Sequence, residues 1–131
     1  MIGIVIVAHG GLAREYLSAV EHVVGKQTGI RTIAIENDCD RERKQEQISS
    51  AADEVDVGDG VVVVTDMFGG SPSNLSLGAC RKSDRKILYG ANLPMLVKLA
   101  KSRSKPFDEA VNAALVAGRK YIDCIDGTNG S

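Results

Sequence analysis

Short apolar runs alternate along the chain with longer segments in which apolar residues recur every three or four positions. The runs cover residues 2–8, 30–35, 61–65 and 87–89, and the first three are rich in β-branched side chains. Such runs indicate buried strands, whereas the three-to-four spacing indicates amphipathic helices. The pattern therefore predicts alternating strands and helices.

Capping residues set the expected helix ends. Asp40 and Asn92 are expected N-caps, and Ser71 caps a third helix that runs to about Arg81. The last helix is expected to end at Gly118. The apolar positions expected to face the core are Leu12, Tyr16, Leu17, Val20, Val23, Val24, Ile48, Ala51, Ala52, Val55, Met95, Leu96, Leu99, Phe107, Ala110, Val111, Ala114 and Leu115.

Repeated β-α units of this length predict an α/β fold, because right-handed crossovers give a parallel sheet with helices on both faces. We expect a small doubly wound, mainly parallel sheet with the strand order 2-1-3-4. Residues 121–125 are expected to add a C-terminal edge strand. Residues 1–126 form one expected domain, followed by a flexible tail at residues 127–131.

Composition narrows the class of protein. A chain of 131 residues is long enough for one domain with its own core, and its formal net charge of -1 gives no long-range field for nucleic acid or an anionic membrane. The three cysteines lack a Cys-x-x-Cys spacing, which favours a reducing compartment over a disulfide framework or a zinc site. The first apolar run is too short for a signal peptide or a membrane span, so we expect a cytoplasmic protein.

Two of the apolar runs end at residues that carry chemistry. The first is followed by His9 and two glycines, and the third by Asp66. In the expected order the first and third strands are neighbours, and the chain leaves them in opposite directions, which opens a crevice at their carboxyl ends. We therefore expect His9 and Asp66 on the two lips of that crevice.

An imidazole that acts as a nucleophile needs one ring nitrogen free and the other held. Asp66 is the best candidate to accept the hydrogen of Nδ1, which leaves Nε2 of His9 to attack a phosphoryl group. Gly10 and Gly11 keep bulk away from the ring, so that a partner protein can reach it. The alternative is a structural histidine at a strand end, with Asp66 capping loop amides. His22 lies off the apolar stripe of its helix and is expected at the surface.

The segment Gly69-Gly70-Ser71-Pro72 is a candidate phosphoryl-binding loop. Unhindered amides before a helix bind anions, and Ser71 adds a hydroxyl donor. No lysine follows the glycines, so the segment is not a nucleotide-binding loop of the P-loop type. Phe68 beside the glycines is expected to pack or to wall the crevice. These residues imply neither a cofactor nor a metal ion.

Three segments carry a resemblance to a known family: residues 6–10 (Ile-Val-Ala-His-Gly), 65–74 (Thr-Asp-Met-Phe-Gly-Gly-Ser-Pro-Ser-Asn) and 90–96 (Gly-Ala-Asn-Leu-Pro-Met-Leu). They resemble the mannose-type enzyme IIA domain of the bacterial phosphoenolpyruvate:sugar phosphotransferase system, and the likeness runs nearly end to end.

The resemblance implies a phosphoryl carrier that works without a cofactor. His9 would take a phosphoryl group from the phosphocarrier protein HPr and pass it to a IIB protein, while Asp66 orients the ring. The phosphoryl group would be contacted by Gly69, Gly70 and Ser71. The family also forms homodimers in which a C-terminal strand crosses to the partner, which would employ residues 121–125.

Two departures leave alternatives open. Many relatives carry tryptophan where this chain has Phe68, which bears on partner preference, and many continue into a fused IIB domain. Stand-alone members serve sugar transport, regulatory phosphotransfer or a dihydroxyacetone kinase. Two alternatives belong to other classes of protein. One is a receiver-like signalling domain phosphorylated on Asp66, and the other is a non-catalytic module that binds a small anion at residues 69–71. A receiver needs an acidic, metal-binding pair after the first strand, where this chain has His9 and glycines.

Overall fold

A four-stranded parallel sheet with the order β2-β1-β3-β4 forms the centre of the molecule. The computed structural model describes residues 1–67, 71–81 and 84–128, and of residues 71–73 the backbone alone. The predicted α/β class and strand order are confirmed. The strands are β1 (Gly3–His9), β2 (Ile30–Ile35), β3 (Val61–Thr65) and β4 (Arg85–Leu88).

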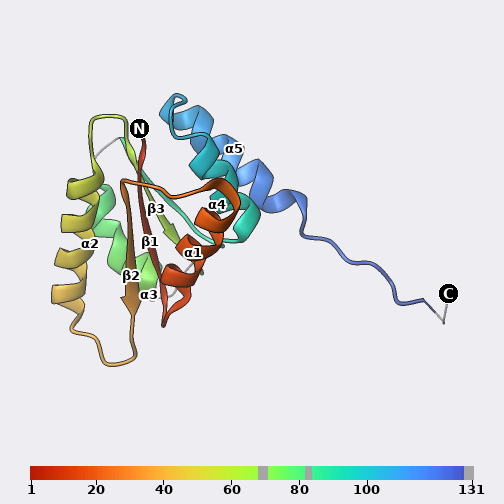
Figure 1. Cartoon of the computed structure of the whole chain (residues 1–131). Helices are drawn as coiled ribbons and strands as arrows, with labels where there is room; N and C mark the ends of the chain where they lie inside the picture. The colour runs from red at the N-terminus through yellow and green to blue at the C-terminus, as the bar shows by residue number, and fades with distance from the viewer. Residues whose placement is uncertain (68–70, 82–83, 129–131) are drawn as a thin grey trace.

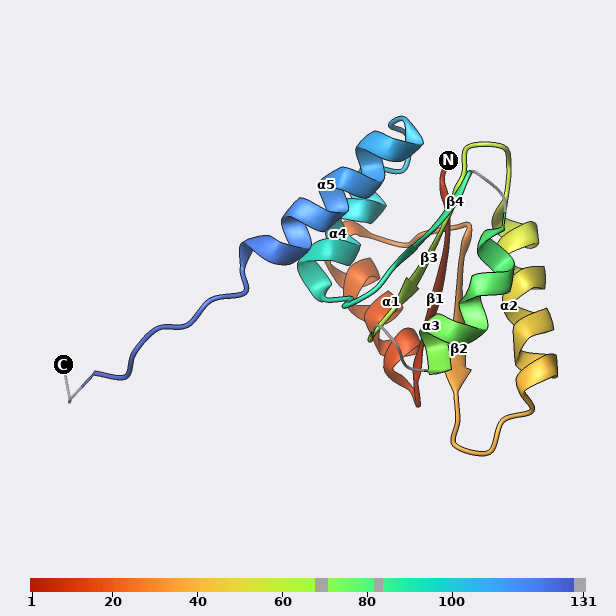
Figure 2. The ribbon, with the colours of Figure 1, turned by 180° about the vertical axis from the view of Figure 1, so that it is seen from behind.

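Helices cover both faces of the sheet (Figures 1 and 2). One face carries α1 (Leu12–Val24), α4 (Leu93–Lys101) and α5 (Phe107–Lys120). The other carries α2 (Arg41–Val55), α3 (Ser71–Ser76) and the short 3-10 helix η1 (Leu77–Cys80). In the described part of the chain, no helix has the length and apolar character needed to cross a membrane.

The central strand β1 contributes side chains to the hydrophobic cores on both faces of the sheet. Ile4 and Ile6 point into the core under α1, α4 and α5, whereas Val5 and Val7 point into the core under α2 and α3. All five residues of β3 are buried. This explains the continuous apolar runs in the sequence, because a strand covered on both faces has no solvent-facing positions.

Two predicted caps hold the helices at their expected starts. The Asp40 side chain accepts a hydrogen bond from the Arg43 amide at 3.3 Å, and the Asn92 Oδ1 atom accepts one from the Met95 amide at 3.0 Å. Each bond satisfies an amide that has no partner within its own helix. The Ser71 prediction is corrected, since α3 begins at Ser71 itself and gives way to η1 at Leu77.

Gly118 does not end the last helix, which continues to Lys120. A Cβ atom at Gly118 would lie 3.1 Å from two side-chain atoms of Met95, so the missing side chain lets α5 approach α4 closely. The Gly118 carbonyl also accepts a hydrogen bond from Asn92 Nδ2 at 2.8 Å. This glycine therefore serves helix packing.

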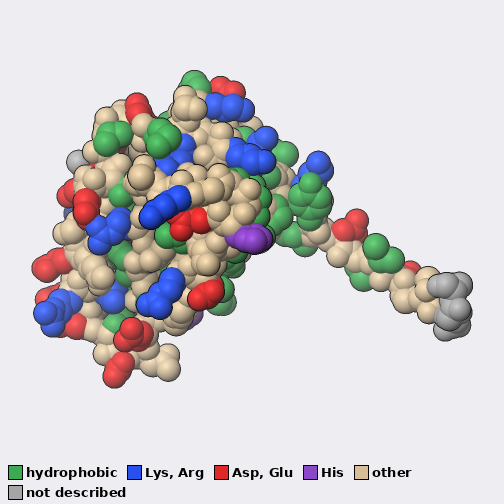
Figure 3. Space-filling view, viewed as in Figure 1, with side chains coloured by type: hydrophobic (Ala, Val, Ile, Leu, Met, Phe, Trp, Pro, Cys, Tyr) green, Lys and Arg blue, Asp and Glu red, His purple; other side chains and the backbone are tan. Residues whose placement is uncertain are grey.

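The expected C-terminal edge strand does not form within the single chain. Residues 121–128 carry no strand and lead away from the body beyond α5 (Figure 1). Hydrophobic side chains remain uncovered along this segment (Figure 3); Ile122 is 73% exposed and Ile125 93%. A strand needs a hydrogen-bonded neighbour, and none of the described strands of the same chain pairs with this segment.

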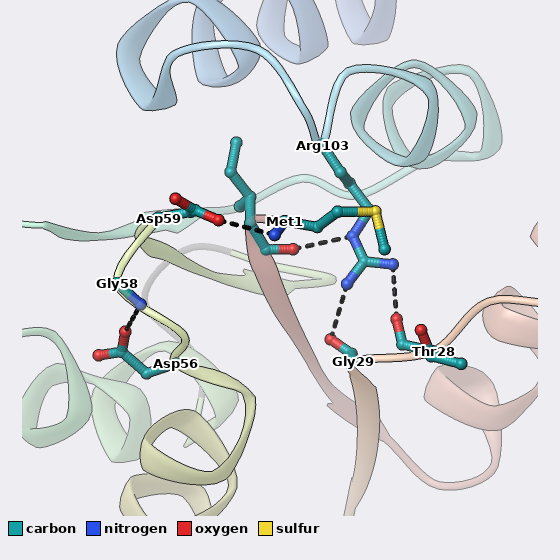
Figure 4. Close-up of polar contacts among 8 residues, drawn as sticks. Met1, Thr28, Gly29, Asp56, Gly58, Asp59 and Arg103 are labelled. Carbon is teal, nitrogen blue, oxygen red and sulfur yellow. Dashed lines mark hydrogen bonds and ion pairs between the residues drawn. The ribbon is translucent and has the colours of Figure 1, made fainter.

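A buried arginine fixes the amino end of the sheet, opposite to the ends that carry His9 and Asp66. Arg103 is 3% exposed and donates hydrogen bonds to the carbonyl oxygens of Ile2 at 2.8 Å, Thr28 at 2.6 Å and Gly29 at 3.1 Å (Figure 4). Ile2 precedes β1, and Gly29 precedes β2. One guanidinium group thus joins the starts of two strands to the loop between α4 and α5.

Candidate active site

His9 and Asp66 meet at the carboxyl edge of the sheet, as the sequence predicts. His9 is the last residue of β1, Asp66 follows the last residue of β3, and the register pairs Val7 with Thr65. The His9 Nδ1 atom lies 2.9 Å from Asp66 Oδ2, and the His9 backbone N–H donates to the same oxygen at 3.1 Å. The parallel register thus places the two side chains within hydrogen-bonding distance.

The two side chains differ in their access to solvent. The His9 side chain is 49% exposed, whereas that of Asp66 is 9% exposed. When Nδ1 carries the ring hydrogen and donates it to Asp66, the lone pair of Nε2 is free. The arrangement therefore suits a nucleophilic imidazole held from behind by a sheltered carboxylate.

The pKa of Asp66 lies below its ordinary value. Burial works against ionisation, but the hydrogen bonds from the ring and the backbone N–H of His9 outweigh it, and the charge of His9 acts in the same direction. The carboxylate is therefore ionised at neutral pH. A negative charge at this place stabilises any positive charge that develops on the ring.

Gly10 has φ +55°, and its amide donates to the Ile35 carbonyl at 3.0 Å. Glycine adopts this left-handed conformation without strain, and it lets the chain turn from β1 into α1. An added Cβ at Gly10 or Gly11 would meet no described atom within 4 Å. Within the described part of the chain, the space beside these two glycines is therefore open.

Sequence reasoning missed one polar group near the pair. Tyr16 was expected only as a core position, yet its hydroxyl donates to the Ala91 carbonyl at 3.0 Å. Burial raises the pKa of Tyr16, and the negative charge of Asp66 raises it further. The sequence signal for this contact is the presence of a tyrosine, instead of an aliphatic residue, on the apolar stripe seven positions after His9.

The structure describes only some of the other predicted site residues. Phe68, Gly69 and Gly70 lie outside the described residues, and the Ser71 side chain is not described, so their contacts stay predictions. His22 is exposed on α1, as predicted. Within the described ranges, no three His, Cys, Asp or Glu side chains gather as metal ligands.

A family model described as "PTS system fructose IIA component" (EIIA-man) matches residues 3–116. The chain belongs to the mannose-type family of phosphotransferase-system IIA components. The matched range includes both His9 and Asp66.

Individual relatives agree with this assignment. The chain is 31% identical over 127 residues to the mannose-specific EIIAB component of the phosphotransferase system of Escherichia coli K12, a match that covers 95% of this chain and 39% of that protein. The chain thus spans well under half the length of this relative.

Solved structures of similar proteins share the fold. The phosphotransferase system component EIIA from Streptococcus agalactiae is 27% identical with a TM-score of 0.83, and the match covers 95% of this chain and 97% of that one. The IIA protein associated with the fucose utilization operon of Streptococcus pneumoniae is 30% identical with a TM-score of 0.77, over 87% and 88% of the two chains.

Proposed function

We propose that this IIA component is a phosphoryl carrier in which His9 accepts a phosphoryl group from HPr phosphohistidine and passes it to a IIB-type acceptor. The observation that supports this most directly is the His9–Asp66 pair, with Nδ1 held at 2.9 Å and the imidazole half exposed. Sugar uptake and regulation are both served by such a carrier, and the acceptor would be a separate or adjoining protein.

The transfer is a displacement at phosphorus. The Nε2 lone pair of His9 forms the new P–N bond while the P–N bond to the donor histidine breaks, and the donor ring recovers its electron pair. The Nδ1 hydrogen stays on His9 and donates to Asp66 throughout. Because transfer between two histidines is close to isoenergetic, catalysis requires mainly alignment and stabilisation of charge.

Contacts to the phosphoryl group are proposed for Gly69, Gly70 and Ser71, on the strength of the family motif. Amides and a hydroxyl at the start of a helix are suited to an anion, and α3 begins at Ser71. Asp66 cannot serve that purpose, because a carboxylate repels the phosphoryl oxygens. We therefore assign Asp66 to the ring and residues 69–71 to the group that the ring carries.

A homodimer is the proposed assembly. β4 is an edge strand of the sheet, and a groove of about 510 Å³ beside it is lined by Ile87, Tyr89, Val111 and Leu115 among others. The uncovered segment 121–125 of a second copy has the apolar character to cover this groove and to pair with β4. Pairing would satisfy backbone groups that a lone edge strand leaves open.

Labelling with radioactive HPr phosphohistidine tests the proposal. We expect one phosphoryl group per chain without added metal, complete loss of label in His9→Ala, and normal labelling of His22→Ala, which removes an exposed histidine on α1. The label should be lost in acid and survive base, as a phosphoramidate does. Label that persists in His9→Ala would overturn the proposal, and base-labile label that requires magnesium would favour a receiver phosphorylated on Asp66.

A further inference from the structure

Tyr16 connects the first turns of α1 to the loop that follows β4. Its ring is partly buried against the core under α1, α4 and α5, and its hydroxyl donates to the carbonyl of Ala91, 75 positions away in the sequence, at 3.0 Å. A phenylalanine would fill the same space. The hydroxyl is therefore the feature of this residue that packing does not explain.

Both backbone groups of Ala91 form hydrogen bonds. Its carbonyl accepts from Tyr16, and its amide donates to the carbonyl of Thr65 at 3.1 Å. Gly90 has φ +76°, a conformation that favours glycine, and it turns the chain after β4 so that Ala91 reaches β3. Hydrogen bonds thus run from Tyr16 through Ala91 to Thr65, the residue directly before Asp66.

Asp66 has few other restraints on its orientation among the described residues. Oδ2 receives both hydrogen bonds from His9, while Oδ1 is buried and has no partner in the described part of the chain. Among the described residues, the direction of the carboxylate is therefore set by its two bonds to His9 and by the backbone at Thr65 and Asp66. The Tyr16 hydroxyl stays protonated at neutral pH, since burial and the charge of Asp66 both raise its pKa, so it remains a donor.

We propose that Tyr16 is a positioning residue of the phosphoryl-transfer site: its hydroxyl holds Ala91 against the end of β3 and thereby fixes the direction in which Asp66 presents Oδ2 to His9. The effect of Tyr16 on the rate of phosphoryl transfer rests on the proposed function. Its effect on the tautomer of the His9 imidazole does not, because the Nδ1–H tautomer depends on the same alignment in the unphosphorylated protein.

The test compares Tyr16→Phe, which removes only the hydroxyl, with Ile48→Val, which trims a fully buried side chain in the core on the other face of the sheet. We expect Tyr16→Phe to slow phosphorylation by HPr phosphohistidine about tenfold, less than the roughly 100-fold that a displacement of about 1 Å can cost. We also expect the ring ¹⁵N shifts of His9 to show a larger share of the Nε2–H tautomer. Ile48→Val should change neither quantity.

Each alternative outcome has a definite meaning. Wild-type rate and tautomer in Tyr16→Phe would overturn the inference, as would a slower rate without a tautomer change, or an equal loss of rate in Ile48→Val. If the wild-type protein is not labelled at His9, the proposed function fails, and the tautomer measurement alone decides whether Tyr16 positions the pair.

Discussion

The two hydrogen bonds between His9 and Asp66 end on the same carboxylate oxygen, Oδ2. The ring Nδ1 lies 2.9 Å from it and the backbone N–H 3.1 Å. One oxygen therefore fixes the ring relative to the backbone at the end of β1, which limits rotation of the imidazole. Because Asp66 is the more buried partner, the geometry is set from inside the protein while the histidine remains open to solvent.

The first prediction concerns Asp66→Asn. The amide has nearly the same size, but it removes the negative charge that stabilises a positive imidazole, and its NH₂ group can select the wrong tautomer. We expect near-wild-type circular dichroism and a phosphorylation rate lower by roughly one to several orders of magnitude in rapid-quench measurements. An unchanged rate in a folded Asp66→Asn protein would show that Asp66 only caps a loop.

The lowered pKa of Asp66 gives a second prediction, on stability. As the pH falls, this carboxyl group takes up its proton in the unfolded chain before it does so in the folded protein. The stability that ionised Asp66 contributes is therefore complete above the ordinary pKa of 3.8. It is lost as the pH falls through the lower pKa of the folded state. Urea unfolding should therefore show that the stability difference between wild type and Asp66→Asn shrinks as the pH falls below about 4. A difference that stays the same as the pH falls from about 5 to about 3 would contradict the lowered pKa of Asp66.

The third prediction concerns the cysteines. Burial raises the pKa of Cys80 to about 11, against a smaller opposing effect of Arg85, whereas Cys124 is exposed. Since the thiolate is the reactive form, Cys80 should be alkylated by iodoacetamide at pH 8 roughly 100-fold more slowly than Cys124. Peptide mass spectrometry over time measures both rates. Denatured protein is the control, in which the two rates should converge; equal rates in the native protein would be inconsistent with burial.

Arg103 gives the fourth prediction. Arg103→Ala removes the side-chain donor from the buried Ile2 carbonyl and from the Thr28 carbonyl, and one of the two donors from the Gly29 carbonyl, which also accepts from the Ile4 amide. It also empties the buried space of the Arg103 side chain, so we expect a loss of about 3 kcal/mol in the free energy of unfolding. Arg103→Lys should recover only part of it, because an ammonium group lacks the planar fork. The exposed Arg41→Ala is the control, expected within about 0.5 kcal/mol of wild type. A similarly small change for Arg103→Ala would contradict the role assigned to this residue.

The sheet and the His9–Asp66 pair were predictable because each depends on local pattern and a topological rule. Continuous apolar runs identify strands buried on both faces, and the order 2-1-3-4 then brings the ends of β1 and β3 together. Three other features depend on contacts between distant segments. Gly118 packs closely against Met95 on another helix. Arg103 donates hydrogen bonds to carbonyl groups more than 70 positions away, and the Tyr16 hydroxyl donates to the Ala91 carbonyl. No short-range pattern encodes those pairings.

The last prediction concerns residues 121–125, which the sequence predicts as a strand and the single chain leaves unpaired. Tyr121, Ile122 and Ile125 are 67%, 73% and 93% exposed, an arrangement that proteins normally cover. If these residues pair with β4 of a second copy, the full chain should run as a dimer in size-exclusion chromatography with light scattering. Deletion from Tyr121 onward should then give a monomer that is less stable or aggregates, even though His9 and Asp66 are untouched.

Deletion of residues 127–131 alone is the matched control for that experiment, since it shortens the chain but keeps the apolar segment. We expect this shorter variant to remain dimeric, because the side chains that would cover the groove beside β4 all precede Gly127. A monodisperse monomer for the full chain, or an intact dimer after deletion from Tyr121, would show that the segment has another role. A dimer lost in both variants would instead place the decisive contacts in residues 127–131, because those are the residues that both deletions remove.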